Sequence, residues 1–331
     1  MIAVAFGFAQ LVAAPFSAAQ QPAAAPANAA APATPATGGG QGGQNRPDDG
    51  VPREHPSNQV TGVDIDRFIG DPYKAVTRVT NGGLNARTML RRGDPYNPGP
   101  MGAVLEYRDD LSLATLEPYF ETSVYESPMI HFYYVQGGEG TIDSGPGTKS
   151  FKLKNGIGVL VGPNIKQRFI NTGDKQLSMI MLSWLDNEGL PAPKEILTVD
   201  TIAKPFGTGR AHWVHMAKSM FGPANGINAT MSAIYFPPMS YGGPHAHVKG
   251  VEEIWVKVGS DEGYAILGSE IRRIVGTGAF LSPPNGKTPH SSMNLSTEHP
   301  SIWLYLSRRA PGQQGAGGQG QPAATAPAPA R

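Results

Sequence analysis

Short runs of β-forming residues, separated by turn residues, limit most strongly how this chain can fold. Between about residues 57 and 309, runs such as HFYYVQ, GVLVG, LSMIMLSWL, ATMSAIYF, EEIWVKV and SIWLYL alternate with Gly, Pro, Asn and Asp. No long stretch repeats its apolar residues at the helical period of about 3.6 residues. The pattern predicts an all-β protein built as an antiparallel sandwich or barrel.

The β-rich region consists of two similar halves. HFYYVQGGEGTI aligns with EEIWVKVGSDEGYAI when Gly138 is set on Gly259, and a two-residue insertion further on sets Asn171 on Asn294. Similarity over such a length indicates a duplicated domain rather than a short repeat unit. We therefore predict an N-terminal domain over residues 57–195 and a C-terminal domain over residues 196–309.

The two ends of the chain have a different composition. Residues 1–19 are apolar, are interrupted by Gln10 and Pro15, and end in small residues, so they predict a signal peptide and a periplasmic or secreted protein. This stretch is too short and too broken for a good membrane span, and the alternative is a disordered apolar tail. Residues 20–56 and 310–331 are rich in Pro, Ala and Gly, which predicts a disordered linker and a disordered tail.

The overall charge and the absence of cysteine narrow the function. The chain has 26 acidic and 27 basic side chains, a net charge of +1, so no field favours binding to nucleic acid or to an anionic membrane. Without cysteine there is no disulfide framework and no thiolate ligand. Any metal chemistry must therefore use His, Asp and Glu.

Histidines with a ligand-like spacing occur in the second half. His245 and His247 are separated by one residue, so on an extended strand both side chains point to one face. Glu252 follows at the start of the strand EEIWVKV, and His290 follows a Pro-Pro-Asn-Gly turn. Three imidazoles and one carboxylate could hold a six-coordinate divalent metal and leave two positions open. Trp255 is out of phase with Glu252, so we expect it to face away from such a site.

With these motifs the chain resembles the cupin superfamily. The first family motif has the form G-x5-H-x-H-x3–4-E-x6-G, and it fits here through Gly259, except that Met239 replaces the first glycine. The second motif, G-x5-P-x-G-x2-H-x3-N, fits through Asn294 with one extra residue before the histidine. The resemblance implies two tandem double-stranded β-helix (jelly-roll) barrels. It also implies one metal site in the C-terminal barrel, formed by His245, His247, Glu252 and His290.

The first half lacks this set of ligands. By the alignment, the corresponding residues are Val124, Glu126, His131 and Gln167. Valine cannot coordinate a metal and glutamine is a poor ligand, so we expect a metal-free first barrel with a structural or substrate-shaping role. A two-ligand remnant at Glu126 and His131 is the alternative.

The resemblance to germins, oxalate-degrading enzymes and quercetin dioxygenases implies a metal-dependent enzyme that acts on a small organic molecule. We expect an oxidoreductase of dioxygenase or oxalate-degrading type, with one Fe, Mn, Ni, Cu or Zn ion and with Glu252 as a proton acceptor. An isomerase or a decarboxylase is a less favoured reading. A non-catalytic metal- or ligand-binding envelope protein is the alternative function. The chain could also assemble as a homo-oligomer. An open coordination position beside a substrate-sized cavity would favour the enzyme.

Overall fold

The computed structural model describes residues 64–208 and 216–308. The predicted signal peptide, the predicted linker and the predicted tail all lie outside the described residues. Helix within these ranges is limited to the short 3-10 helices η2 (Ile65–Phe68), η3 (Pro72–Lys74) and η4 (Pro223–Asn225). No described helix is long and apolar enough to cross a membrane.

The first half forms two sheets. The larger is eight-stranded, with the order β12-β9-β6-β11-β5-β3-β2 and with β4 beside β3; the smaller has the order β10-β7-β8. The strands of the larger sheet are β2 (Thr77–Thr80), β3 (Leu84–Arg92), β4 (Ala103–Leu105), β5 (Asp110–Leu116), β6 (Ile130–Gly137), β9 (Ile157–Val161), β11 (Leu177–Trp184) and β12 (Ile196–Asp200). Those of the smaller sheet are β7 (Glu139–Asp143), β8 (Phe151–Lys154) and β10 (Arg168–Asn171).

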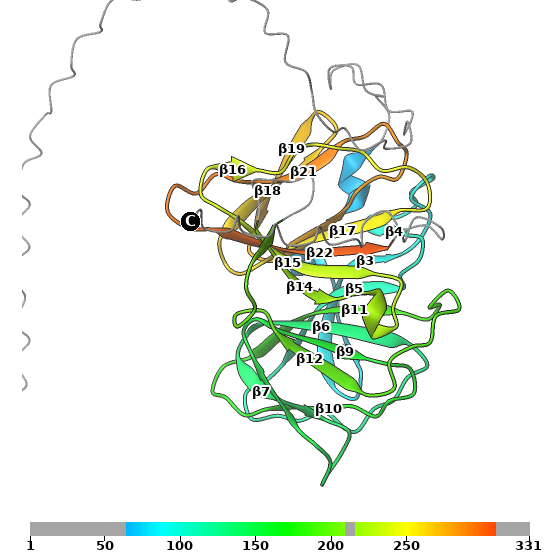
Figure 1. Ribbon diagram of the computed structural model, residues 1–331, viewed down its shortest axis with the longest axis vertical. Helices are drawn as coiled ribbons and strands as arrows, with labels where there is room; N and C mark the ends of the chain where they lie inside the picture. The colour runs from blue at the N-terminus through cyan, green and yellow to red at the C-terminus, as the bar shows by residue number, and fades with distance from the viewer. Residues whose placement is uncertain (1–63, 209–215, 309–331) are drawn as a thin grey trace, which may run out of the picture. The chain divides into compact units, whose positions relative to one another are not determined.

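The second half repeats this arrangement (Figure 1). Its seven-stranded sheet has the order β1-β20-β17-β22-β15-β14-β13, and its four-stranded sheet has the order β16-β21-β18-β19. The strands of the larger sheet are β1 (Ile69–Gly70), β13 (Gly207–Thr208), β14 (Met216–Phe221), β15 (Thr230–Phe236), β17 (Glu252–Val258), β20 (Gly278–Leu281) and β22 (Ser301–Arg308). Those of the smaller sheet are β16 (Ser240–Tyr241), β18 (Glu262–Leu267), β19 (Glu270–Val275) and β21 (His290–Asn294). The prediction of an all-β protein made of two tandem barrels is confirmed.

One hydrogen-bond pattern shows the duplication in atomic detail. In each half, a buried asparagine at the end of the strand that carries the second motif donates its amide hydrogens to three backbone carbonyls. The acceptors are Leu116, Glu117 and Lys175 for Asn171, and Phe236, Pro237 and His299 for Asn294. The two residues that the sequence alignment matched therefore fasten the same loop in both barrels.

The two halves exchange strands at the edges of their larger sheets. β1 lies in the first half of the chain, ahead of that half's own strands, yet it pairs with β20 of the second half. β12 follows the predicted boundary at residues 195 and 196, yet it pairs with β9 of the first half. Each exchanged strand covers a sheet edge that would otherwise present unpaired N–H and C=O groups.

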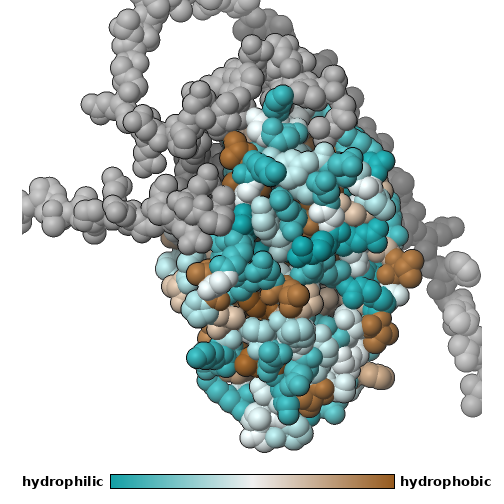
Figure 2. Space-filling view, turned by 90° about the vertical axis from the view of Figure 1, so that its right-hand side faces the viewer, coloured by the Kyte–Doolittle hydropathy of each residue, from teal (hydrophilic) through white to brown (hydrophobic). Residues whose placement is uncertain are grey.

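Apolar and charged contacts join the halves. The largest apolar cluster contains side chains from both of them, and the ring centroids of Phe132 on β6 and Phe221 on β14 lie 6.2 Å apart. Arg308 at the end of β22 binds Glu188, with Nε–Oε1 and Nη2–Oε2 distances of 2.7 and 2.6 Å. Its guanidinium carbon also lies 3.5 Å from the centroid of the Tyr107 ring. On the face shown in Figure 2, by contrast, polar side chains predominate and the apolar groups are scattered.

We expect Arg308→Met to lower the free energy of unfolding by about 3 kcal/mol, because Glu188 would remain partly buried without its counterion. The side chains of this pair are 4% and 15% exposed. The matched control is Arg273→Met, since Arg273 pairs with Glu262 where the side chains are 62% and 38% exposed. That control should cost less than about 1 kcal/mol. Urea denaturation measures both values, and equal losses would contradict the role given to Arg308.

Candidate metal centre

Four ligand-type side chains meet inside the second barrel. They are His245, His247, Glu253 and His290, and one ligand atom from each lies within 4.8 Å of all the others. The backbone brings two of them together: His290 N donates to His245 O at 2.9 Å, and His245 N donates to His290 O at 3.3 Å. The three histidines that the sequence predicted therefore converge in the structure.

The glutamate of this cluster is Glu253, and the predicted ligand Glu252 is corrected accordingly. The Glu252 carboxylate points to the first half, where its Oε2 accepts hydrogen bonds from the backbone N–H groups of Glu106 at 2.6 Å and Tyr107 at 2.9 Å. Trp255 was expected to face away, but its Nε1 donates to Glu253 Oε1 at 2.8 Å. Every residue of β17 is buried, so the apolar pattern of this strand does not reveal which face is interior.

Hydrogen bonds at the outer ring nitrogens orient two of the imidazoles. His290 Nδ1 lies 2.7 Å from Ser282 Oγ, and His245 Nδ1 lies 3.1 Å from Gly243 O. A carbonyl can only accept, so Nδ1 of His245 carries the proton and Nε2 has a lone pair for a metal. Metal-binding histidines are commonly fixed in this way by a partner on the other ring nitrogen.

Glu253 lies between two of the histidines. Its Oε1 is 2.7 Å from His290 Nε2, and its Oε2 is 2.9 Å from His247 Nε2. Burial favours the neutral carboxyl, but the adjacent His247 and His290 outweigh burial and hold the pKa of Glu253 well below its ordinary value. Burial in turn lowers the pKa of His290, in spite of the neighbouring carboxylate. Metals bind carboxylates in the ionised form and imidazoles in the neutral form, so the shifts at Glu253 and His290 both favour metal binding.

One buried atom tests whether a metal fits this cluster. His247 Nε2 is shielded from solvent and has no hydrogen-bond partner among the described residues, although Glu253 Oε2 is only 2.9 Å away. Because a nitrogen lone pair facing a carboxylate oxygen is repulsive, either a proton or a metal cation must lie between these two atoms. The four donors therefore fit a divalent metal, and a set of three nitrogens and one oxygen suits Fe, Mn, Ni, Cu or Zn.

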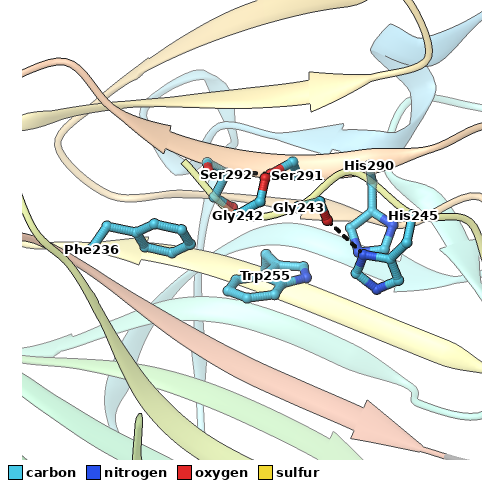
Figure 3. A pocket seen from close by; sticks show the side chains of 8 residues that line it. All are labelled: Phe236, Gly242, Gly243, His245, Trp255, His290, Ser291 and Ser292. Carbon is cyan, nitrogen blue, oxygen red and sulfur yellow. Dashed lines mark hydrogen bonds between the residues drawn. The ribbon is translucent and has the colours of Figure 1, made fainter. Parts of the chain in front are cut away.

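A small cavity adjoins two of the ligands (Figure 3). It encloses about 170 Å³ of space, including the part that opens to solvent, and its lining comprises Phe236, Gly242, Gly243, His245, Trp255, His290, Ser291 and Ser292. Ser292 Oγ is buried and has no hydrogen-bond partner within the described ranges. A buried hydroxyl without a hydrogen-bond partner is unfavourable. Ser292 Oγ is therefore available to form a hydrogen bond with a polar group of a ligand in this cavity.

Comparison with solved structures identifies the architecture. No protein-family model matches the sequence, and no curated protein matches it. AerE from Microcystis aeruginosa superposes with a TM-score of 0.54 at 12% identity, over 73% of this chain and 99% of that one. Vicilin from Corylus avellana (hazelnut) gives 0.56 at 12%, over 74% and 86%, and a variant of oxalate decarboxylase from Bacillus subtilis gives 0.52 at 8%, over 73% and 77%. The chain has the cupin fold.

The first cupin barrel shows which residues replace the metal ligands. Tyr125 and Gln167 exchange two backbone hydrogen bonds, as His245 and His290 do, and Asn164 N donates to Ser127 O as Gly286 N donates to His247 O. His131 faces Val161 across the sheet as Glu253 faces Ser282. The counterparts of the four ligands are therefore Tyr125, Ser127, His131 and Gln167.

This pairing corrects two of the four aligned positions. The predicted counterparts Val124 and Glu126 are each one residue out of register, because the number of residues between the second and third ligand positions differs between the two barrels. Both side chains are exposed. A remnant ligand pair of Glu126 and His131 is therefore not formed. His131 is buried, and both of its ring nitrogens lack hydrogen-bond partners in the described part of the chain. Burial lowers its pKa to about 4, so its imidazole is neutral at pH 7.

Larger side chains fill the interior of the first cupin barrel. Phe169 lies two residues after Gln167, as Ser292 lies two residues after His290, and its ring centroid is 4.8 Å from that of Tyr133. The Tyr133 hydroxyl donates to Gln167 Oε1 and accepts from Asn81 Nδ2, each at 2.9 Å. The space beside the metal ligands is thus a feature of the second barrel, where a serine takes the place of a phenylalanine.

The adjacent glutamates of β17 allow a sharp test of the ligand set. Glu253→Gln should weaken metal binding by at least about tenfold, because it removes a charged ligand. Loss of a residue that only hydrogen-bonds to a ligand already lowers metal affinity by about that factor. Glu252→Gln should leave the metal content unchanged, since the amide oxygen can still accept from the two backbone N–H groups. Elemental analysis of untagged, dialysed protein measures the metal, and melting curves verify that both variants fold. Metal loss in Glu252→Gln alone would restore the original prediction.

The two barrels should also differ in metal content. We expect about one metal per chain, and His290→Ala should remove most of it, because one of four ligands is lost. Gln167→Ala, at the corresponding place in the first barrel, should leave the content unchanged. Two metals per chain, or equal losses in both variants, would show that the first barrel also binds a metal.

Proposed function

We propose that the protein is a metal-dependent enzyme that converts a small organic molecule in its second cupin barrel, as an oxidoreductase of dioxygenase or oxalate-degrading type. The observation that carries this proposal is the cavity beside the cluster of three histidines and Glu253. A metal with a purely structural role is normally enclosed by its ligands, whereas a catalytic metal keeps a position accessible to substrate. The cavity supports the second kind of site.

Each residue of the site has a chemical task in this proposal. The Nε2 atoms of His245, His247 and His290 would hold the ion together with a carboxylate oxygen of Glu253. A bound metal of this group supplies a Lewis acid that polarises a substrate oxygen and, for Fe, Mn, Ni or Cu, a redox couple. Glu253 is ionised at neutral pH, so it can also accept a proton from the substrate. The indole N–H of Trp255 holds Oε1 of this carboxylate in place.

The cavity limits the size and the shape of the substrate. The cavity has room of about 10 Å³, enough for about one water-sized group, whereas the sites of drug-sized ligands have about 300–1,000 Å³, so the substrate has few heavy atoms. The rings of Phe236 and Trp255 form apolar walls that suit a flat molecule. Ser292 Oγ can form a hydrogen bond with a polar group at the end remote from the metal.

Two further observations support the proposal. Some of the solved structures with the same fold are oxalate decarboxylases, at 8% to 12% identity. At this identity the likeness shows the fold alone, so oxalate is one candidate among small organic acids. The apolar segment of residues 1–19 supports a location in the periplasm or outside the cell, where such an enzyme would meet exogenous substrates.

The experiment is a turnover assay on protein loaded with Mn, Fe, Ni, Cu or Zn in turn. Small carboxylic acids and phenols are supplied, and oxygen consumption and carbon dioxide release are recorded. We expect turnover with at least one metal, and Glu253→Gln should reduce it by at least about a hundredfold, since a removed metal or base commonly costs that much. Metal binding without turnover of any compound would instead favour a non-catalytic metal- or ligand-binding protein of the cell envelope.

A further inference from the structure

A second and larger depression lies on the first half, away from the metal ligands. It encloses about 680 Å³ of space, open to solvent, and it is lined by Tyr73, Thr77, Asn85, Arg87, Leu113, Thr115, Glu117 and Gln176. None of these residues lines the cavity beside the metal ligands. We call this depression the Arg87 groove.

The strand register forms the floor of the groove. Arg87 on β3 lies directly between Thr77 on β2 and Leu113 on β5, and Asn85 lies beside Thr115 in the next row on the same face. Residues two apart on a strand point to the same side of the sheet, so the Asn85 and Arg87 side chains both enter the groove. The guanidinium therefore has polar and apolar neighbours in fixed places.

The Arg87 side chain is half-buried, and it makes no hydrogen bond or ion pair with any residue in the described ranges. The neighbouring arginine Arg78, on β2, differs in this respect, because its Nη2 lies 2.7 Å from Asp110 Oδ1. Arg87 thus presents donors that suit a carboxylate in a two-pronged hydrogen bond. The side chains of Asn85 and Thr115 likewise have no hydrogen-bond partner among described residues.

The walls add selectivity. Tyr73 on η3 is 57% exposed and lies beside Gly276 of the second half, so its ring offers a flat apolar surface. Glu117 also lines the groove, and its Oε1 accepts a hydrogen bond from Gln176 Nε2 at 2.7 Å. The repulsion between this carboxylate and an anionic ligand grows with the charge of the ligand, so a monoanion is favoured over a phosphate ester.

We propose that the Arg87 groove binds a small organic monocarboxylate that also carries hydroxyl groups. Its carboxylate would pair with the Arg87 guanidinium, its hydroxyls would bind Asn85 and Thr115, and its carbon frame would lie against Tyr73 and Leu113. About 320 Å³ of the groove is available to ligand atoms, which is within the usual range of about 300–1,000 Å³ for a small-molecule site. This site does not depend on the metal or on the proposed enzymatic activity.

The probes are D-gluconate and D-glucuronate, with D-glucose as the uncharged comparison. Calorimetric titration of the full chain at low salt should show saturable binding of at least one acid and none of glucose. Arg87→Gln should weaken that binding by at least about tenfold, which corresponds to about 1.4 kcal/mol for a lost charged hydrogen bond. Arg78→Gln is the matched control on the adjacent strand and should change the dissociation constant by less than about twofold. His290→Ala should bind the acid as the unmodified protein does, which separates this site from the metal centre.

Several results would overturn the proposal. Binding of neither acid, or equal weakening by Arg78→Gln and Arg87→Gln, would contradict the role given to Arg87. Loss of binding in His290→Ala would assign the acid to the metal centre instead. Size-exclusion chromatography with light scattering completes the test: a dimer that Arg87→Gln converts to a monomer would show that a second copy of the chain occupies the groove.

Discussion

The metal centre depends on one backbone contact, the pair of hydrogen bonds between His245 and His290. This contact joins the segment before β17 to the start of β21, and it holds the two imidazoles next to each other. Asn294 fixes the other end of β21 through three carbonyls, so the strand cannot slide. Because a shift of one residue would turn every side chain to the opposite face, this register determines which residues reach the interior.

The two halves show that the barrel and the metal chemistry are separate properties of this chain. Both barrels have the same strand order and the same asparagine anchor. The first has Tyr125, Gln167 and Phe169 where the second has His245, His290 and Ser292. Large side chains and a neutral hydrogen-bond network stabilise the first interior, whereas the second combines polar donors with empty space. Packing alone therefore does not require the histidines, and their presence points to function.

The first half nevertheless contributes to the second site. Glu252 accepts hydrogen bonds from two backbone N–H groups of the first half, and it precedes Glu253 directly on β17. Burial raises the pKa of Glu252, because it disfavours the ionised carboxylate, and the nearby Arg108 and the two backbone hydrogen bonds act in the opposite direction. These hydrogen bonds therefore help to stabilise a carboxylate that is shielded from water. The contact helps to hold the start of β17 against the first half. A barrel without metal ligands can thus support the position of a ligand in its neighbour.

The sequence by itself determined the all-β class, the duplication and the three histidines, because alternation, turn residues and short motif spacings are local properties of the chain. It did not determine which of two adjacent glutamates faces the metal, since β17 is buried on both sides and its apolar residues mark no interior face. The exchange of β1 and β12 between the halves also depended on tertiary structure, because edge pairing joins residues that are far apart in the chain. The same is true of the Arg87 groove, in which Thr77, Arg87 and Leu113 become neighbours only through the register of three strands.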